Sequence, residues 1–128
     1  MTSQRALAGV AHDIAHHAVS GVSYVHPHLH QACQAVGVRE ASVDLVVADP
    51  YPPGLPQVEP LRLALSALRD RFFGILAANG YGPTDIQSAT LRFQFPLIGG
   101  DGYSCQATAV IESSSGRRYS AILEQAGA

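Results

Sequence analysis

The chain has 128 residues, the size of one domain, and its 47% hydrophobic content is enough to form a core without disulfide or metal support. A net charge of −2, with dispersed arginines and no basic run, excludes the electrostatic footprint of a nucleic-acid-binding protein. Only 14% of the residues are charged, below the roughly 25% of typical soluble domains, which favours self-association.

The cysteines and the apolar runs bear on the compartment. Cys33 and Cys105 are too few for a disulfide framework or a cysteine metal set, so we expect reduced thiols. No run approaches the roughly 18 apolar residues of a membrane span. Near the start of the chain, Asp13 and several histidines interrupt any signal-peptide core. We therefore expect a soluble, cytoplasmic protein with a single domain over residues 1–128.

The first periodic segment covers residues 3–25, where apolar side chains recur at three- and four-residue steps and predict an amphipathic helix. Gly21 weakens the far end of this helix. Pro27 then suits the first turn of a second, shorter helix, and Gly37 suits its end.

Residues 41–48 are rich in β-branched side chains and predict the first strand. The proline-rich residues 49–59 predict a stiff, exposed loop. The strongest periodic signal follows at residues 60–80, where Pro60 and Gly80 suit the two ends of a helix. The apolar stripe of this helix consists of Leu61, Ala64, Leu65, Leu68, Phe72, Ile75 and Leu76.

Three further strands are predicted at residues 86–95, 103–113 and 117–124. A three-residue loop with Gly116 at positive φ fixes the last hairpin. The first hairpin is expected to turn within residues 98–102. The resulting pairs are Phe95–Cys105, Phe93–Ala107, Leu91–Ala109, Ile111–Tyr119, Ala109–Ala121 and Ala107–Leu123.

The small side chains of the middle strand, Cys105, Ala107 and Ala109, leave a shallow trough. We expect Leu68 and Phe72 of the 60–80 helix to pack on it. The order α-α-β-α-β-β-β predicts an α+β domain with its helices packed on one face of a mostly antiparallel four-stranded sheet.

All six histidines lie between residues 12 and 30. His12 and His16 have the i, i+4 spacing of a metal-binding pair, but no third ligand is evident, and zinc sites need three or four. We therefore predict no metal and no other cofactor. His30 lies three residues before Cys33, a spacing that can activate a thiol, although a cysteine on the apolar side of a helix is usually inert packing.

The second face of the predicted sheet is mostly polar, with three apolar side chains among its residues. An ordinary solvated face explains it best, but a subunit contact or a cavity wall would also suit it. Asp44 and Arg92 are the groups to test in the last case. The members of this face are Asp44, Val46, Ser88, Thr90, Arg92, Gln94, Gln106, Thr108, Val110, Glu112, Arg118, Ser120, Ile122 and Glu124.

The sequence fixes no specific function and leaves two hypotheses. The first is a homo-oligomeric module that binds a small ligand or a protein partner, with neither nucleic acid nor membrane involved. Its self-contact would use Leu63 and Phe73, which lie off the helix stripe, or the apolar residues of the second sheet face.

The alternative is a small-molecule enzyme that draws acid–base chemistry from the histidine-rich segment and the polar sheet face. No nucleophile, base and orienting group form a visible set, so the sequence leaves enzymatic activity open. The candidate residues are His26, His28, His30, Asp44, Tyr51 and Arg92.

Overall fold

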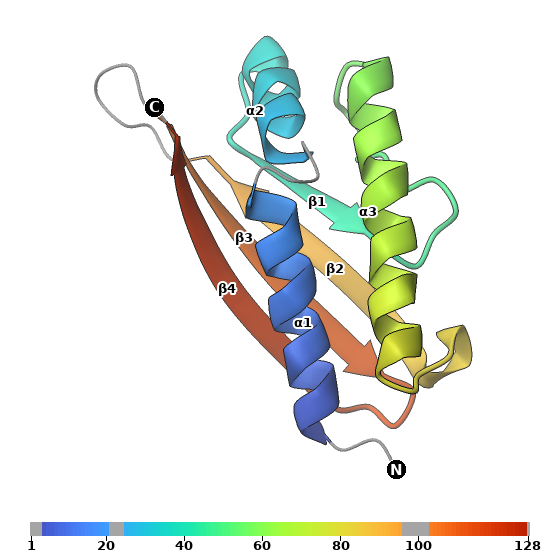
Figure 1. The fold of residues 1–128 in the computed structure, drawn as a ribbon. Helices are drawn as coiled ribbons and strands as arrows, with labels where there is room; N and C mark the ends of the chain where they lie inside the picture. The colour runs from blue at the N-terminus through green and yellow to red at the C-terminus, as the bar shows by residue number, and fades with distance from the viewer. Residues whose placement is uncertain (1–3, 21–24, 96–102, 128) are drawn as a thin grey trace.

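The computed structural model describes residues 4–20, 25–95 and 103–127 (Figure 1). It confirms the predicted α+β class and the order α-α-β-α-β-β-β. The elements are α1 (Gln4–Val19), α2 (Val25–Val36), β1 (Glu40–Asp44), α3 (Glu59–Ala78), the short 3-10 helix η1 (Pro83–Asp85), β2 (Ile86–Gln94), β3 (Tyr103–Ser113) and β4 (Arg118–Gly127).

The four strands form one sheet in the order β1-β2-β3-β4, with every neighbouring pair antiparallel. The three α-helices lie over one face of the sheet, and we call the other the open face (Figure 1). The predicted register is confirmed for the pairs Leu91–Ala109, Phe93–Ala107, Ala107–Leu123, Ala109–Ala121 and Ile111–Tyr119. Residues 98–102, where the first hairpin was expected to turn, lie outside the described residues.

Local sequence signals account for the helix ends. Pro60 lies in the first turn of α3, where a missing N–H costs no hydrogen bond. Gly37 and Gly80, which follow α2 and α3, have φ angles of 74° and 83°. These are left-handed values that glycine adopts without strain. All seven residues of the predicted α3 stripe are buried.

The trough on β3 is filled by a different helix from the one expected. Leu68 and Phe72 of α3 are fully buried, but α1 is the helix whose backbone lies close to β3 and β4, and α3 packs beside α1 and α2 (Figure 1). The buried side of α1 includes Ala11, Ala15 and Ala18. These short side chains allow a close approach to the small residues of β3, whereas leucine and phenylalanine on α3 require more space.

β1 is shorter than predicted. It ends at Asp44, whose Oδ1 accepts a hydrogen bond from the Val46 N–H at 3.0 Å. A side chain that bonds the backbone two residues ahead forms a turn, and this turn follows the last strand residue directly. The extended run predicted to reach residue 48 therefore stops four residues early.

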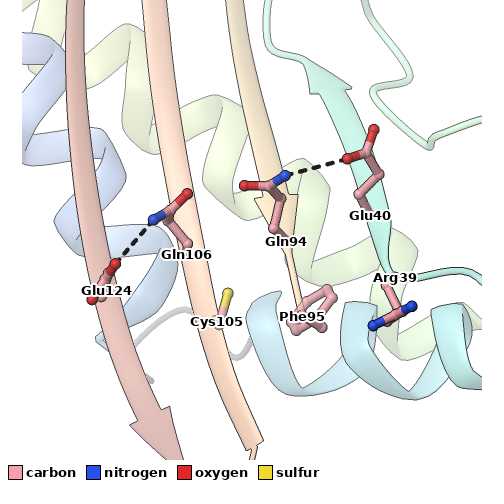
Figure 2. A pocket seen from close by; sticks show the side chains of 7 residues that line it. All are labelled: Arg39, Glu40, Gln94, Phe95, Cys105, Gln106 and Glu124. Carbon is pink, nitrogen blue, oxygen red and sulfur yellow. Dashed lines mark hydrogen bonds between the residues drawn. The ribbon is translucent and has the colours of Figure 1, made fainter. Parts of the chain in front are cut away.

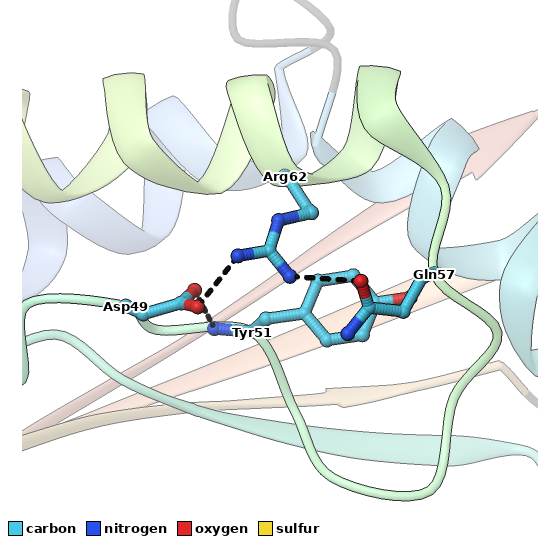
Figure 3. A network of polar contacts seen from close by, with 4 residues as sticks. All are labelled: Asp49, Tyr51, Gln57 and Arg62. Atoms are coloured by element: carbon cyan, nitrogen blue, oxygen red, sulfur yellow. Dashed lines mark hydrogen bonds and ion pairs between the residues drawn. The ribbon is translucent and has the colours of Figure 1, made fainter.

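The proline-rich loop between β1 and α3 is tied to the helix by Arg62 (Figure 3). The guanidinium donates to Asp49 Oδ2 at 2.7 Å and to Gln57 Oε1 at 3.2 Å, and it lies 5.4 Å from the centre of the Tyr51 ring. Exposed contacts of this kind stabilise a protein by about 1 kcal/mol at most. Their effect is to fix where the loop runs.

The two edges of the sheet differ. β1 has five residues, and a cavity of about 310 Å³ separates this strand from Pro52, Pro53 and Leu55 of the proline-rich loop. β4 has ten residues and pairs with β3 alone within the described part of the chain. Among the described helices, none has the length and apolar content needed to cross a lipid bilayer.

Candidate functional site

Four polar side chains, one from each strand, form a line across the open face. Glu40 pairs with Gln94, Gln94 with Gln106, and Gln106 with Glu124. Directly paired residues in a sheet project on the same face, so the four side chains lie next to one another in strand order. We call this set the Glu–Gln row. It lies at the end of the sheet where α2 is found (Figures 1 and 2).

The two glutamates orient the two glutamines. Gln106 Nε2 donates to Glu124 Oε1 at 2.9 Å, and Gln94 Nε2 donates to Glu40 Oε2 at 3.4 Å. An ionised carboxylate only accepts hydrogen bonds, so each glutamine must present its NH₂ group to the neighbouring glutamate. The carbonyl oxygens of both amides are consequently directed toward the middle of the row (Figure 2).

Glu40 is held in its ionised form. Arg92 Nη2 donates to Glu40 Oε2 at 2.7 Å, from the same face of β2. This bond, assisted by the bond from Gln94, lowers the pKa of Glu40 below its ordinary value. Glu40 therefore acts as a hydrogen-bond acceptor at neutral pH, as the orientation of Gln94 requires.

A cavity of about 440 Å³ lies at this end of the sheet. The Glu–Gln row lines it together with Arg39, Phe95 and Cys105. Phe95 and Cys105 are buried and give the cavity an apolar side, while Arg39 is exposed and places a cation at its margin. The volume falls within the range of roughly 300–1,000 Å³ that is usual for small-molecule sites.

The cysteines are poor nucleophiles. Burial, with a smaller contribution from Cys33, raises the pKa of Cys105 to about 12. Burial also raises the pKa of Cys33. Because the thiolate is the reactive form, both side chains are neutral packing groups at physiological pH. The suggested activation of Cys33 by His30 gains no support from these environments.

The residues considered for acid–base chemistry do not come together. His26, His28 and His30 lie on α2, in the helix layer, and the His30 ring packs 5.0 Å from the Phe95 ring. Asp44 and Arg92 lie on the open face of the sheet.

Tyr51 belongs to a third location, the proline-rich loop beside Arg62. The sheet separates the histidines from the open-face carboxylate and guanidinium. Over the part of the chain that the structure describes, these candidate residues therefore share no pocket that would support the acid–base hypothesis.

His12 and His16 are exposed on α1, with ring centroids 6.4 Å apart, and His12 Nδ1 lies 3.6 Å from Asp13 Oδ1. No group of three or more His, Cys, Asp or Glu side chains with metal-site geometry occurs in residues 4–20, 25–95 and 103–127.

Sequence reasoning found part of this site. It placed Gln94, Gln106 and Glu124 on the polar face, and the predicted hairpin registers already align these three. It missed Arg39 and Glu40, because β1 was expected to start at residue 41 and its pairing with β2 was not predicted. The alternation of Glu40, Ser42 and Asp44 with apolar residues was the available signal.

Comparison of the chain with protein-family models, with curated proteins and with solved structures found no match.

Proposed function

We propose that this chain is a binding module for a small molecule that carries paired N–H donors on an apolar body, such as an amidine, a guanidine or a primary amide. The observation that carries the proposal is the orientation of Gln94 and Gln106, whose amide oxygens are both directed to the middle of the Glu–Gln row. Two convergent acceptors select a ligand with two donors.

The remaining lining residues suit the rest of such a ligand. The donor group would lie between the two amide oxygens, and the apolar body would lie against Phe95 and Cys105. Glu40 and Glu124 would act as positioning residues, because they hold the amides in the acceptor orientation. Ligands that present only acceptors, such as carboxylates, would face the same oxygens and be rejected.

Three nearly isosteric probes test this selectivity: benzamidine, benzamide and benzoate. We expect titration calorimetry or ligand-observed NMR to rank them in that order of affinity, with no binding of benzoate. Gln106→Ala should weaken benzamidine binding by roughly 10- to 100-fold, the usual effect of losing a hydrogen bond to a charged group.

Glu124→Gln should also weaken binding, because Gln106 could then turn its NH₂ group toward the cavity. The matched control is Glu112→Gln, which removes a carboxylate from the same face but outside the row. Equal affinity for benzamidine and benzoate, or an equal loss in Glu112→Gln and Glu124→Gln, would contradict the proposal.

The second part of the proposal is that the module works as a homo-oligomer. Its support is the low fraction of charged residues together with large apolar side chains at the surface. Leu63 on α3 is 62% exposed, and Ile122 on the open face is 61% exposed. Phe73, the other residue expected in a helix-mediated contact, is half-buried under the Arg69 guanidinium, 4.8 Å from its ring centre.

A further inference from the structure

The outer edge of β4 has backbone hydrogen-bonding groups that pair with no strand of the described residues. Ser113 N–H donates to the Arg117 carbonyl at 2.8 Å, and hydrogen-bonded pairs recur at every second residue of an antiparallel ladder. Tyr119, Ala121 and Leu123 therefore direct their N–H and C=O groups toward β3. The groups directed away from β3 belong to Arg118, Ser120, Ile122 and Glu124.

The side chains along this edge are complementary to themselves. If two β4 strands pair antiparallel about a two-fold axis at Ala121, each residue meets the residue equally far on the other side of position 121. Arg118 of each copy then lies opposite Glu124 of the other copy, which gives two such pairs on the open face. On the helix-covered face, Tyr119 lies opposite Leu123. Opposite charges and apolar pairs directly across from one another both stabilise antiparallel strands.

We propose that two copies of this chain join through their β4 edges in this register and form one continuous eight-stranded sheet. The proposal rests on the homo-oligomer part of the proposed function and specifies its interface. A two-fold axis makes the contact self-complementary and closes the assembly at two copies. This interface is distinct from a contact through Leu63 and Phe73 of α3. It lies along the edge strand of the sheet and leaves the centre of the open face uncovered.

The edge of β4 is favoured over that of β1 by two features of the fold. β4 is ten residues long and contains no proline, whereas β1 has five residues and runs beside the proline-rich loop. Natural edge strands avoid pairing through short length, proline or a covering segment. β1 is short and has a loop beside it, and β4 has neither protection within the described residues.

Both charged residues have capacity for a second partner. The Arg118 side chain is 73% exposed, and its Nε and Nη2 atoms contact Glu112 Oε2 at 3.4 and 3.2 Å, which leaves Nη1. Glu124 accepts from Gln106 through Oε1, which leaves Oε2. The partner subunit's Arg118 would therefore lie beside the outer end of the Glu–Gln row. There it would donate to Glu124 Oε2 and so hold this side chain in the position that orients Gln106.

Charge reversal with recombination tests the register. Arg118→Glu gives a chain that is acidic at both positions, and Glu124→Arg gives one that is basic at both. Each variant alone replaces two attractive pairs with two repulsive ones, so we expect its dimer to dissociate roughly 30-fold more readily than the unmodified dimer. When the two variants are mixed, both contacts become attractive again, and native mass spectrometry should show a heterodimer.

Three further measurements complete the experiment. Circular dichroism establishes that each variant is folded, and the heterodimer itself shows that neither variant has lost the interface through misfolding. Asp44→Arg on the opposite sheet edge makes the same change in charge as Glu124→Arg and should leave the dimer intact. Ser120→Pro should give a folded monomer, because it removes an N–H that is directed away from β3.

The proposal is overturned if the unmodified protein stays monomeric at about 100 μM. At that concentration, even a weak dimer with a micromolar dissociation constant would form. A dimer that neither charge reversal weakens, or a mixture that forms no heterodimer, also overturns it. Benzamidine titration of the unmodified chain and of the Arg118→Glu variant separates the two hypotheses. Benzamidine binding by a chain that does not dimerise leaves the ligand proposal standing alone. A dimer of the unmodified chain that does not bind benzamidine leaves the interface standing alone.

Discussion

His26 shows how one buried side chain links stability to pH. It is only 5% exposed on α2. Burial lowers its pKa below the usual 6.5, a hydrogen bond to the backbone of Ala18 partly opposes this shift, and the charge of His30 adds to it. His17 and His30 also have lowered pKa values, each mainly because of burial. In the folded protein, these imidazoles therefore favour the neutral form.

We predict that the protein loses stability as the pH falls below 6.5. Between the lowered folded pKa values and 6.5, the unfolded chain binds more protons than the folded chain, so protonation favours unfolding. Each extra proton contributes a slope of up to about 1.4 kcal/mol per pH unit. The free energy of unfolding, measured with urea between about pH 5.5 and 7.5, should decrease toward the acid end.

The His26→Gln variant should have a shallower pH dependence, whatever its stability at neutral pH. His12→Gln, which removes one exposed imidazole from α1, is the matched variant for comparison. An unfolding free energy that does not change between about pH 5.5 and 7.5, or the same slope in His26→Gln as in the unmodified chain, would show that these histidines are not linked to folding.

At the level of elements, the close contact between α1 and the β3–β4 hairpin depends on small side chains. Ala15 is fully buried in α1, on the side that lies close to β3 and β4. We predict that Ala15→Leu lowers the free energy of unfolding by about 1–3 kcal/mol, the usual cost of overfilling a packed core. Ala8→Leu, at an exposed position of the same helix, should change it by less than about 0.5 kcal/mol.

Urea denaturation of the two variants decides this prediction. Similar midpoints for Ala15→Leu and Ala8→Leu would mean that α1 can shift away from the sheet without cost. In that case the alanines would not determine which helix occupies the trough.

Most elements followed from local patterns in the sequence. Periodicity and turn chemistry were sufficient to predict the buried stripe of α3, the glycines that end the helices and the hairpin registers. Each of these features depends on residues that are close together in the chain. The choice of α1 for the trough depends on contacts between residues about a hundred positions apart. The sequence contained the relevant alanines, but the spacing of leucines in α3 gave a stronger periodic signal.

The candidate site was less predictable for the same reason. The Glu–Gln row requires three strand pairings at once, and the pairing of β1 with β2 spans the whole of α3. The turn at the end of β1 also contains a hydrogen bond that Asp44 Oδ1 accepts from the Val46 N–H. Strand propensity takes no account of such a side-chain bond. Errors of one residue at a strand end are enough to lose a row member such as Glu40.

For the whole molecule, the packing predicts a single cooperative unfolding transition. The described buried residues form one core that includes side chains from all three α-helices and from β1, β2 and β3. No helix can leave this core without exposing apolar surface of the others. Far-UV circular dichroism, which reports the helices, and tyrosine fluorescence should give the same urea midpoint. Separate midpoints would instead indicate two independently folding parts.

The position of α1 also has a consequence for synthesis of the chain. Residues 4–19 leave the ribosome before residues 103–127, which form β3 and β4, the strands on which α1 packs. The apolar side of α1 therefore has no sheet to pack on until about a hundred further residues have been synthesised. Contacts between residues so far apart form slowly, and nascent apolar helices attract chaperones in the interval. The core of this domain therefore cannot be completed until β4 has left the ribosome.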